Sequence, residues 1–236
     1  MKVLELFAGT RSIGREFQSR GHEVFAVEWD RSFSGIDLYA DVGKLTADEI
    51  RGKFGTPDVI WASPDCSSYS VAGLGHHRDG VKPKTEYARF CDKVNSHMVD
   101  LILELNPKLW FVENPRAMMR KMPFIERLLR EGRGARYTVT YCQYGERRMK
   151  PTDIFTNHPD PRFRPPCRKG DPCHDAAPRG SKTGTQGIRG ARDRARIPKL
   201  LCKHVVDICE AFEAGGAGGP KCGRECASVR PVVPQC

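Results

Sequence analysis

The sequence has no long apolar run. No stretch approaches the roughly 20 apolar residues that a helix needs to cross a bilayer. The apolar start, KVLELFAG, meets a threonine and an arginine directly after its glycine, so it does not resemble a secretory signal peptide. These absences argue against a membrane-spanning or secreted protein, and we expect a cytoplasmic one.

Acidic residues are scarce between His158 and Lys203, where twelve lysines and arginines stand against four aspartates and glutamates. The whole chain has a formal net charge of +10, so this one stretch holds most of the imbalance. A local basic surface favours a polyanionic partner such as nucleic acid. A solvated loop is the alternative.

The ten cysteines lack the regular spacing of a disulfide framework. Without a secretory context, free thiols in a reducing compartment are the natural expectation. Cys167, Cys173 and His174 lie close together in the sequence, but a zinc site normally needs four ligands and no second tight pair stands nearby. We therefore predict no metal and keep zinc at these three residues as an alternative.

Apolar runs alternate with segments of helical spacing from Lys2 to Gly145. This order predicts an α/β fold with a doubly wound, mostly parallel sheet. Strands are expected at 2–9, 22–30, 57–64, 108–115 and 137–145, and helices within 10–21, 41–55, 85–106 and 122–132.

The alternation stops after Asn157. Residues 158–195 are rich in proline, glycine and arginine, which predicts a short basic insert, and helical spacing returns over 196–214. The glycine-rich residues 215–236 are expected to form a flexible tail. The chain is thus divided into a main domain (1–157), the insert, a returning helix and the tail.

Ligands bind beyond the carboxyl ends of the strands in an open parallel sheet, and unusual residues occupy those ends here. The run FAGTRSIG forms a glycine-containing turn after the first expected strand. Glu28 could accept hydrogen bonds from both hydroxyls of a ribose, and Trp29 could cover a purine face. Asp41 could accept from an adenine amino group or simply cap a helix.

Two further strand ends carry reactive groups. Cys66 follows a buried strand in WASPDCSSYS, and Glu113 follows LWFV. A glutamate close to a thiolate forms a pair of an acid and a nucleophile. From the residues alone, packing, metal binding and a disulfide remain alternatives for Cys66.

Six motifs follow one another in order: LELFAGTRSIG, VEWD, ADV, SPDCSSYS, FVENP and YCQYGERRMKPTDIFTN. Together they resemble the cytosine-5 DNA methyltransferases, in particular the small phage-type members. The resemblance covers residues 2–157 and, more weakly, RARIPKLLCKHVVDI. It implies a Rossmann-like fold and a monomeric enzyme. That enzyme would use S-adenosyl-L-methionine to methylate carbon 5 of a cytosine flipped from double-stranded DNA, in a bacterial host cell if phage-encoded.

On this resemblance Cys66 is the nucleophile that adds to carbon 6 of the cytosine, and Glu113 holds the N3 edge of the base. Asn114 supports the loop, while Lys150 and Thr152 lie near the flipped base. The residues expected to bind the cofactor are Phe7, Ala8, Gly9, Thr10, Ser12, Ile13, Glu28, Trp29, Asp41, Val42 and Pro64. Those expected to bind nucleic acid are Ser67, Ser68, Ser70, Arg148, Arg162, Arg164, Arg168 and Lys169.

The sequence departs from the family pattern in several places. Asp65 precedes the cysteine, and its carboxylate would raise the pKa of Cys66 if it faced the thiol. The family's Gln-x-Arg-x-Arg motif is not intact, and a Gly-Asn pair is absent near RARIPK, so a modified cofactor stays open.

The short insert limits base reading to few contacts, which predicts phosphate anchoring and a short target such as a dinucleotide. An RNA cytosine-5 methyltransferase and a catalytically silent protein that binds cofactor or nucleic acid are the alternatives.

Overall fold

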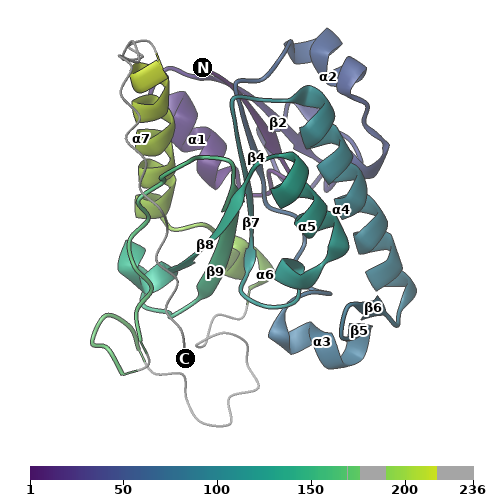
Figure 1. Cartoon of the computed structure of the whole chain (residues 1–236), viewed down its shortest axis with the longest axis vertical. Helices are drawn as coiled ribbons and strands as arrows, with labels where there is room; N and C mark the ends of the chain where they lie inside the picture. Colours follow the sequence, from purple (N-terminus) through teal and green to yellow (C-terminus); the bar gives the residue numbers. More distant parts are fainter. Residues whose placement is uncertain (169, 176–189, 217–236) are drawn as a thin grey trace, which may run out of the picture.

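A seven-stranded sheet of order β3-β2-β1-β4-β7-β9-β8 lies at the centre of the molecule (Figure 1). The computed structural model describes residues 1–168, 170–175 and 190–216. The first five strands in this order pair in parallel, whereas β9 is antiparallel to both of its neighbours. The predicted α/β fold with a mostly parallel sheet is confirmed. The strands are β1 (Lys2–Leu6), β2 (Glu23–Glu28), β3 (Leu38–Tyr39), β4 (Val59–Ala62), β7 (Leu109–Pro115), β8 (Ala135–Thr140) and β9 (Pro151–Thr156).

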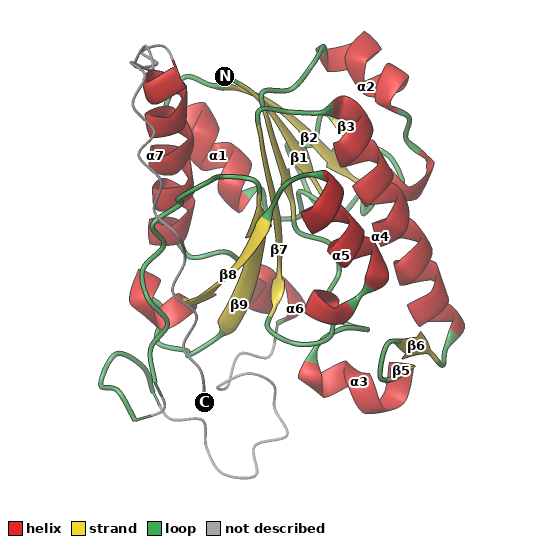
Figure 2. Ribbon diagram, in the orientation of Figure 1, coloured by secondary structure: helices red, strands yellow, loops and turns green. Residues whose placement is uncertain are grey.

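Helices cover both faces of the sheet (Figure 2). One face packs against α2 (Ala47–Phe54), α4 (Glu86–Leu105) and α5 (Pro123–Glu131), and the other against α1 (Ser12–Ser19) and α7 (Lys199–Gly216). Successive strand residues point to opposite faces, so both faces of β1 and β4 are buried. For this reason the sequence shows continuous apolar runs there and no polar alternation.

The two cores show this alternation directly. Leu4 and Ile60 join the core beneath α4, while Val3 and Trp61 join the core beneath α7. Each fully buried large apolar side chain contributes about 1.5–3 kcal/mol relative to exposure. The helix predicted over 196–214 corresponds to α7, which returns to the sheet and packs beside α1 (Figure 1).

Several elements differ from the sequence prediction. β9 was not predicted because Pro151 and Asp153 are unusual in a strand; Asp153 is tolerated because it accepts hydrogen bonds from Arg120 and from the Thr138 hydroxyl. The strand predicted over 137–145 ends at Thr140, since the chain turns there and Gly145 adopts a φ of 86°. The short elements are η1 (Val42–Lys44), α3 (Val71–His77), β5 (Arg78–Asp79), β6 (Lys82–Pro83), η2 (Met119–Lys121), η3 (Tyr141–Tyr144) and α6 (Ala191–Ala195).

The carboxyl ends of the parallel strands meet at one edge of the sheet, the lower edge in Figure 1, near α3 and α6. Because β9 runs the other way, its first residues reach this same edge; Thr152 pairs with Pro115 at the end of β7. Among the described helices, none is long and apolar enough to cross a membrane.

Candidate active site

Cys66 lies in a tight turn between β4 and α3. The backbone N–H groups of Tyr69 and Ser70 donate to the Cys66 carbonyl at 3.0 and 2.8 Å, which closes the turn directly before the helix. The Asn114 side-chain amide donates to the Pro64 carbonyl at 3.0 Å. Asn114 is fully buried at the end of β7, so this bond joins the cysteine turn to the neighbouring strand.

The carboxylate of Asp65 is engaged in hydrogen bonds with two neighbouring residues. Its Oδ1 accepts from the Ser67 backbone N–H at 2.7 Å and from the Tyr87 hydroxyl at 2.8 Å. Burial raises the pKa of Cys66 to about 11; the Lys150 ammonium lowers that pKa, and the charges of Asp65 and Glu113 raise it. The Asp65 carboxylate therefore still raises the pKa of Cys66, although its hydrogen bonds go to Ser67 and Tyr87.

Glu113 is buried near the end of β7, where its Oε1 accepts a hydrogen bond from the Tyr141 hydroxyl at 3.0 Å. Tyr141 opens η3 and is itself fully buried. The Lys150 ammonium lies 4.7 Å from the centre of the Tyr141 ring. Glu113, Tyr141 and Lys150 thus gather beside Cys66, with Thr152 buried at the start of β9.

The turn after β1 has an unusual backbone. Phe7, Gly9 and Arg11 have φ values of 55°, 48° and 56°, in the left-handed region. The Gly9 backbone N–H donates to Glu28 Oε2 at 2.9 Å, which ties this turn to the end of β2. Glu28 Oε1 accepts from the backbone N–H groups of Trp29 and Asp30.

A buried ion pair supports this turn from below. Arg11 Nε and Glu5 Oε2 lie 3.6 Å apart, and Glu5 Oε1 accepts from the Gly14 backbone N–H at 3.0 Å. Burial raises the pKa of Glu5 to about 7. A Cβ on Gly14 would lie 2.2 Å from Glu5 Oε2, so any side chain there would displace the Glu5 carboxylate.

Of the remaining residues predicted to bind the cofactor, some are exposed and others are buried. Trp29 is 71% exposed, so its ring is free to stack against a flat ligand. Asp41 accepts from the Gly43 backbone N–H at 2.9 Å and caps η1. The Thr10 and Ser12 hydroxyls lie 2.9 Å apart, whereas Ile13 and Val42 point into the core. Ala8 and Pro64 are buried beneath the surface of their turns.

Arg148, predicted to bind nucleic acid, is buried. Its side chain is 3% exposed and donates to the carbonyls of Arg194 and Arg196 at 3.2 and 3.3 Å. Lys150 also donates to the Arg194 carbonyl, at 3.3 Å. Arg148 therefore fixes the segment that returns from the insert over the catalytic edge, a role that its position in the sequence did not indicate.

The other predicted nucleic-acid residues are distributed unevenly. Ser67 is exposed and Ser70 half-buried, but Ser68 is fully buried beneath Arg78, whose Nε donates to the Ser68 carbonyl at 2.8 Å. We accordingly leave Ser68 and Arg148 out of the proposed nucleic-acid surface. Arg162, Arg164 and Arg168 are exposed on the insert, and Lys169 lies outside the described residues.

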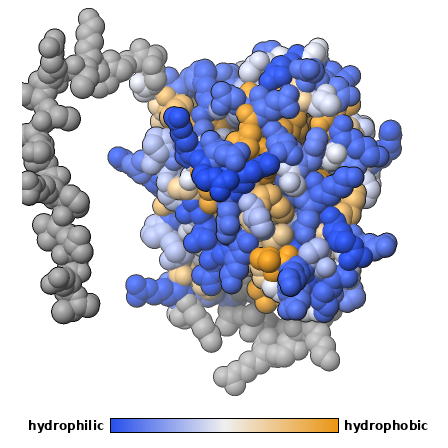
Figure 3. All heavy atoms as spheres, turned by 45° about the vertical axis from the view of Figure 1, so that its right-hand side comes forward, coloured by the Kyte–Doolittle hydropathy of each residue, from blue (hydrophilic) through white to orange (hydrophobic). Residues whose placement is uncertain are grey.

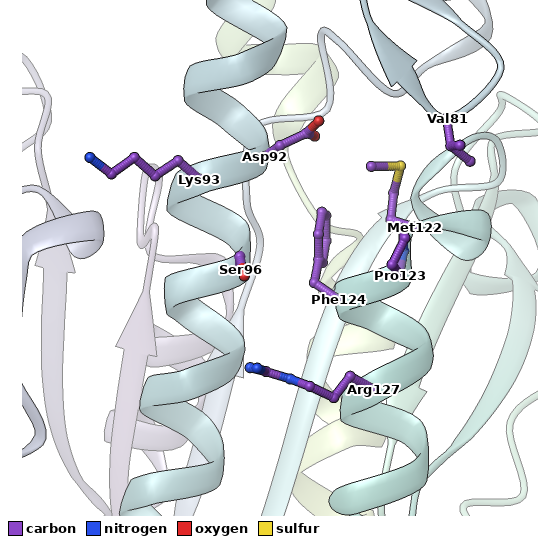
Figure 4. Close-up of a pocket in the computed structure, with 8 residues that line it drawn as sticks. All are labelled: Val81, Asp92, Lys93, Ser96, Met122, Pro123, Phe124 and Arg127. Carbon is purple, nitrogen blue, oxygen red and sulfur yellow. The ribbon is translucent and has the colours of Figure 1, made fainter.

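A shallow hollow between α4 and α5 contains none of the predicted site residues. In Figure 4, Phe124 and Met122 face it from the α5 side, and Asp92 and Ser96 lie on α4. The face shown in Figure 3 is mainly hydrophilic, with hydrophobic side chains in separate patches.

The sequence missed several residues that shape the site. Tyr141 opens the motif YCQYGERRMKPTDIFTN, but no pattern in the sequence indicated a role for it. Arg78 stacks 4.2 Å from the centre of the Tyr69 ring and pairs with Asp92, which holds the loop after Cys66 against α4. No local pattern marks these contacts, because each joins residues from different elements.

Comparisons with known proteins agree with this geometry. The model of the family "C-5 cytosine-specific DNA methylase" matches residues 1–141. The chain is 27% identical over 230 residues to a Frog virus 3 (isolate Goorha) protein named "Probable DNA (cytosine-5)-methyltransferase", and the match covers 89% of this chain and 100% of that protein.

Solved structures show the same fold. One is a candidate DNA modification methyltransferase encoded within an E. coli prophage, with a TM-score of 0.51, 19% identity, and 66% of this chain and 46% of that chain covered. Another is the Entamoeba histolytica methyltransferase EhMeth, with a TM-score of 0.51, 14% identity and coverages of 67% and 53%. The chain thus spans about half the length of these two structures.

The family model matches residues 1–141, more than half of the 236-residue chain. Family membership implies S-adenosyl-L-methionine as methyl donor. The chain belongs to the C-5 cytosine-specific DNA methylase family.

Proposed function

We propose that the protein transfers a methyl group from S-adenosyl-L-methionine to carbon 5 of a cytosine in double-stranded DNA, as a small phage-type enzyme. One observation carries this proposal. Cys66 and Glu113 stand at the ends of the neighbouring strands β4 and β7, joined by the bond between Asn114 and Pro64. A nucleophile and an acid therefore face the same edge of the sheet, with the Lys150 charge acting on the thiol.

The turn after β1 and the end of β2 fit an adenosyl group. Gly9 allows close approach of the backbone, Glu28 presents a carboxylate beside it, and the exposed Trp29 offers a face for a purine. When bound, S-adenosyl-L-methionine supplies an electrophilic methyl group. Asp41, two residues beyond β3, borders the same region.

Cys66 activates the base in this proposal. Its thiolate adds to carbon 6 of the cytosine, which makes carbon 5 nucleophilic enough to take the methyl group. Glu113 holds the N3 edge with a hydrogen bond or a proton as negative charge builds on the ring, and the Tyr141 hydroxyl fixes the carboxylate. A base then removes the carbon 5 proton, the bond from sulfur to carbon 6 breaks, and the thiolate is regenerated.

The free thiol is protonated at neutral pH, because burial raises the pKa of Cys66 to about 11. Ionisation must therefore accompany substrate binding, and Lys150 is placed to favour it. The ammonium of Lys150 lies between the Tyr141 ring and the Arg194 carbonyl, close enough to stabilise a negative sulfur. The Thr152 hydroxyl, at the start of β9, donates to the Lys150 carbonyl at 3.4 Å and so supports the position of Lys150.

The DNA side of the proposal rests on the basic insert. Arg162, Arg164 and Arg168 are exposed, and arginines of this kind anchor phosphates. The exposed Ser67 and the half-buried Ser70 border the cysteine turn where a flipped base would arrive. Few side chains are left to read base edges, each bidentate contact being worth about 1–3 kcal/mol. We therefore propose a short target such as a dinucleotide.

A covalent trap tests the reaction. The protein is incubated with S-adenosyl-L-methionine and with duplex DNA or RNA that contains 5-fluorocytosine, whose fluorine blocks the final elimination. We expect an adduct with DNA that survives a denaturing gel and disappears in Cys66→Ser. An adduct with RNA alone would replace DNA by RNA as substrate, and no adduct with either polymer, while the cofactor still binds, would show a catalytically silent protein.

Sequencing of methylated cytosines in a bacterial host that expresses the chain tests the length of the target. A preference confined to the bases next to the cytosine supports the short site. Methylation with no bias within two bases of the cytosine, or a required context longer than four bases, would refute it.

A further inference from the structure

Four side chains that are separated in the sequence converge beside the catalytic edge. Cys142 belongs to η3 in the main domain, whereas Cys167, Cys173 and His174 belong to the insert. Their three sulfur atoms and one histidine nitrogen all lie within 4.8 Å of one another. The sequence showed only three of these ligands, because Cys142 is brought to them by the turn that ends β8.

The spacing fits one tetrahedral metal. Bonds of about 2.3 Å from zinc to sulfur and 2.0–2.1 Å from zinc to nitrogen place the ligand atoms of a tetrahedron about 3.5–3.8 Å apart. Cys173 Sγ lies 3.6 Å from Cys142 Sγ and 3.5 Å from His174 Nδ1, and Cys167 Sγ lies 3.7 Å from His174 Nδ1. The sulfurs of Cys142 and Cys167 are closer, at 3.0 Å, yet well beyond the disulfide length of about 2.05 Å.

We propose that Cys142, Cys167, Cys173 and His174 bind a structural zinc ion. Three thiolates and one neutral imidazole form a closed set of four ligands, which leaves no position for water or substrate and therefore indicates a structural role. On binding, the three cysteines release their thiol protons to solvent and no electron is transferred. The set differs from the catalytic Cys66, which lies in another turn and is not among these ligands.

Neighbouring groups are arranged to support the ligands. The Gln143 side-chain amide donates to Cys173 Sγ at 3.5 Å, a contact that favours the thiolate. The Cys167 backbone N–H donates to the Thr140 hydroxyl at 2.9 Å, which fixes the insert at the end of β8. Arg147 and Asp175 form an ion pair at 2.7 Å directly beyond the cluster.

The site connects the insert to the catalytic residues. Cys142 follows Tyr141, whose hydroxyl donates to Glu113, so a metal at Cys142 would fix residues 167–174 of the insert next to a residue of the proposed active site. The insert is too short to build an apolar core of its own, and small modules of this kind commonly depend on a metal. Zinc would thus position the exposed Arg168 to contact the bound nucleic acid.

Metal analysis of the full chain tests the site. The protein is purified without a histidine tag, and its metals are measured by plasma mass spectrometry; we expect about one zinc per chain. Cys142→Ser and His174→Ala should each lower the zinc content at least about fivefold, whereas His174→Cys restores four ligands and should retain it. Growth with cobalt should give the visible bands of tetrahedral thiolate-bound cobalt, a readout independent of methylation and of any variant's folding.

Two controls separate this site from other cysteines. Cys66→Ser removes the catalytic thiol and should leave the zinc content unchanged, as should the combined change of Cys222, Cys226 and Cys236 to serine. Loss of zinc in the latter variant with retention in Cys142→Ser would overturn the assignment. So would folded wild-type protein free of metal, or a mass two hydrogens lower with Cys142 and Cys167 linked in a disulfide.

Discussion

Alkylation of Cys66 in the free protein is expected to be slow at neutral pH and to accelerate steeply in alkali. Only the thiolate reacts, and burial raises the pKa of this thiol to about 11 from an ordinary value near 9.0. At pH 8 about one thiol in a thousand is ionised, roughly 100-fold fewer than for an unperturbed cysteine. A thiolate of higher pKa is also more nucleophilic, with a Brønsted coefficient of about 0.4–0.5, so the net slowing is about tenfold.

The assay is iodoacetamide labelling of Cys66, followed by peptide mass spectrometry from pH 7 to pH 10.5, with tryptophan fluorescence as the check on folding. The rate should rise about tenfold per pH unit over most of this range without a plateau. Lys150→Met should lower the rate because it removes the charge that favours the thiolate, and Asp65→Asn should raise it. Lys108→Met, at the opposite edge of the sheet, is the matched control. A plateau below about pH 9 in the wild type would refute the burial argument.

Three further predictions concern Glu5, Tyr141 and Trp29. The raised pKa of Glu5 favours its protonated form in the folded chain, so the free energy of unfolding should fall by about 3 kcal/mol between about pH 4.5 and 7 and then level off. Urea titrations should show this slope removed in Glu5→Gln, and an unchanged slope would contradict the buried carboxyl. Tyr141→Phe removes the donor to Glu113 and should lower the methylation rate about tenfold with cofactor affinity unchanged; equal loss of both would point to misfolding. Trp29→Ala should weaken cofactor binding about fivefold in calorimetry, about 1 kcal/mol, and an unchanged affinity would exclude stacking.

The parts of the fold that the sequence predicted are those in which one local pattern suffices. β1, β2, β4 and β7 are short apolar runs followed by polar residues, and the long helix α4 begins at a Thr85 cap. Cys66 and Glu113 were predicted as site residues because Cys66 lies shortly after the end of one such run and Glu113 lies near the end of another. Their proximity then follows from parallel strands ending at one edge.

What the sequence did not predict depends on contacts between distant elements. Arg148 has the sequence context of a surface cation, yet the carbonyls of Arg194 and Arg196 bury it. Ser68 lies among exposed hydroxyls in the sequence, and Arg78 covers it. Cys142 was placed inside a strand, and only the turn at Thr140 brings it to the cysteines of the insert.

The reversed direction of β9 also determines where the insert, residues 158–195, leaves the sheet and where it returns. β9 ends at the edge opposite the active site, where Asn157 Oδ1 accepts from the Trp110 backbone N–H at 2.9 Å. The chain must therefore return about 20 Å, the length of six strand residues, before Cys167 reaches the catalytic edge. At the other end of the insert, the Arg148 guanidinium donates to the carbonyls of Arg194 and Arg196 at this same edge. Cys167 and the Arg194–Arg196 segment are thus each held at the edge that carries the proposed catalytic residues, so a change in the number of residues between them is expected to leave Cys66 and Glu113 in place.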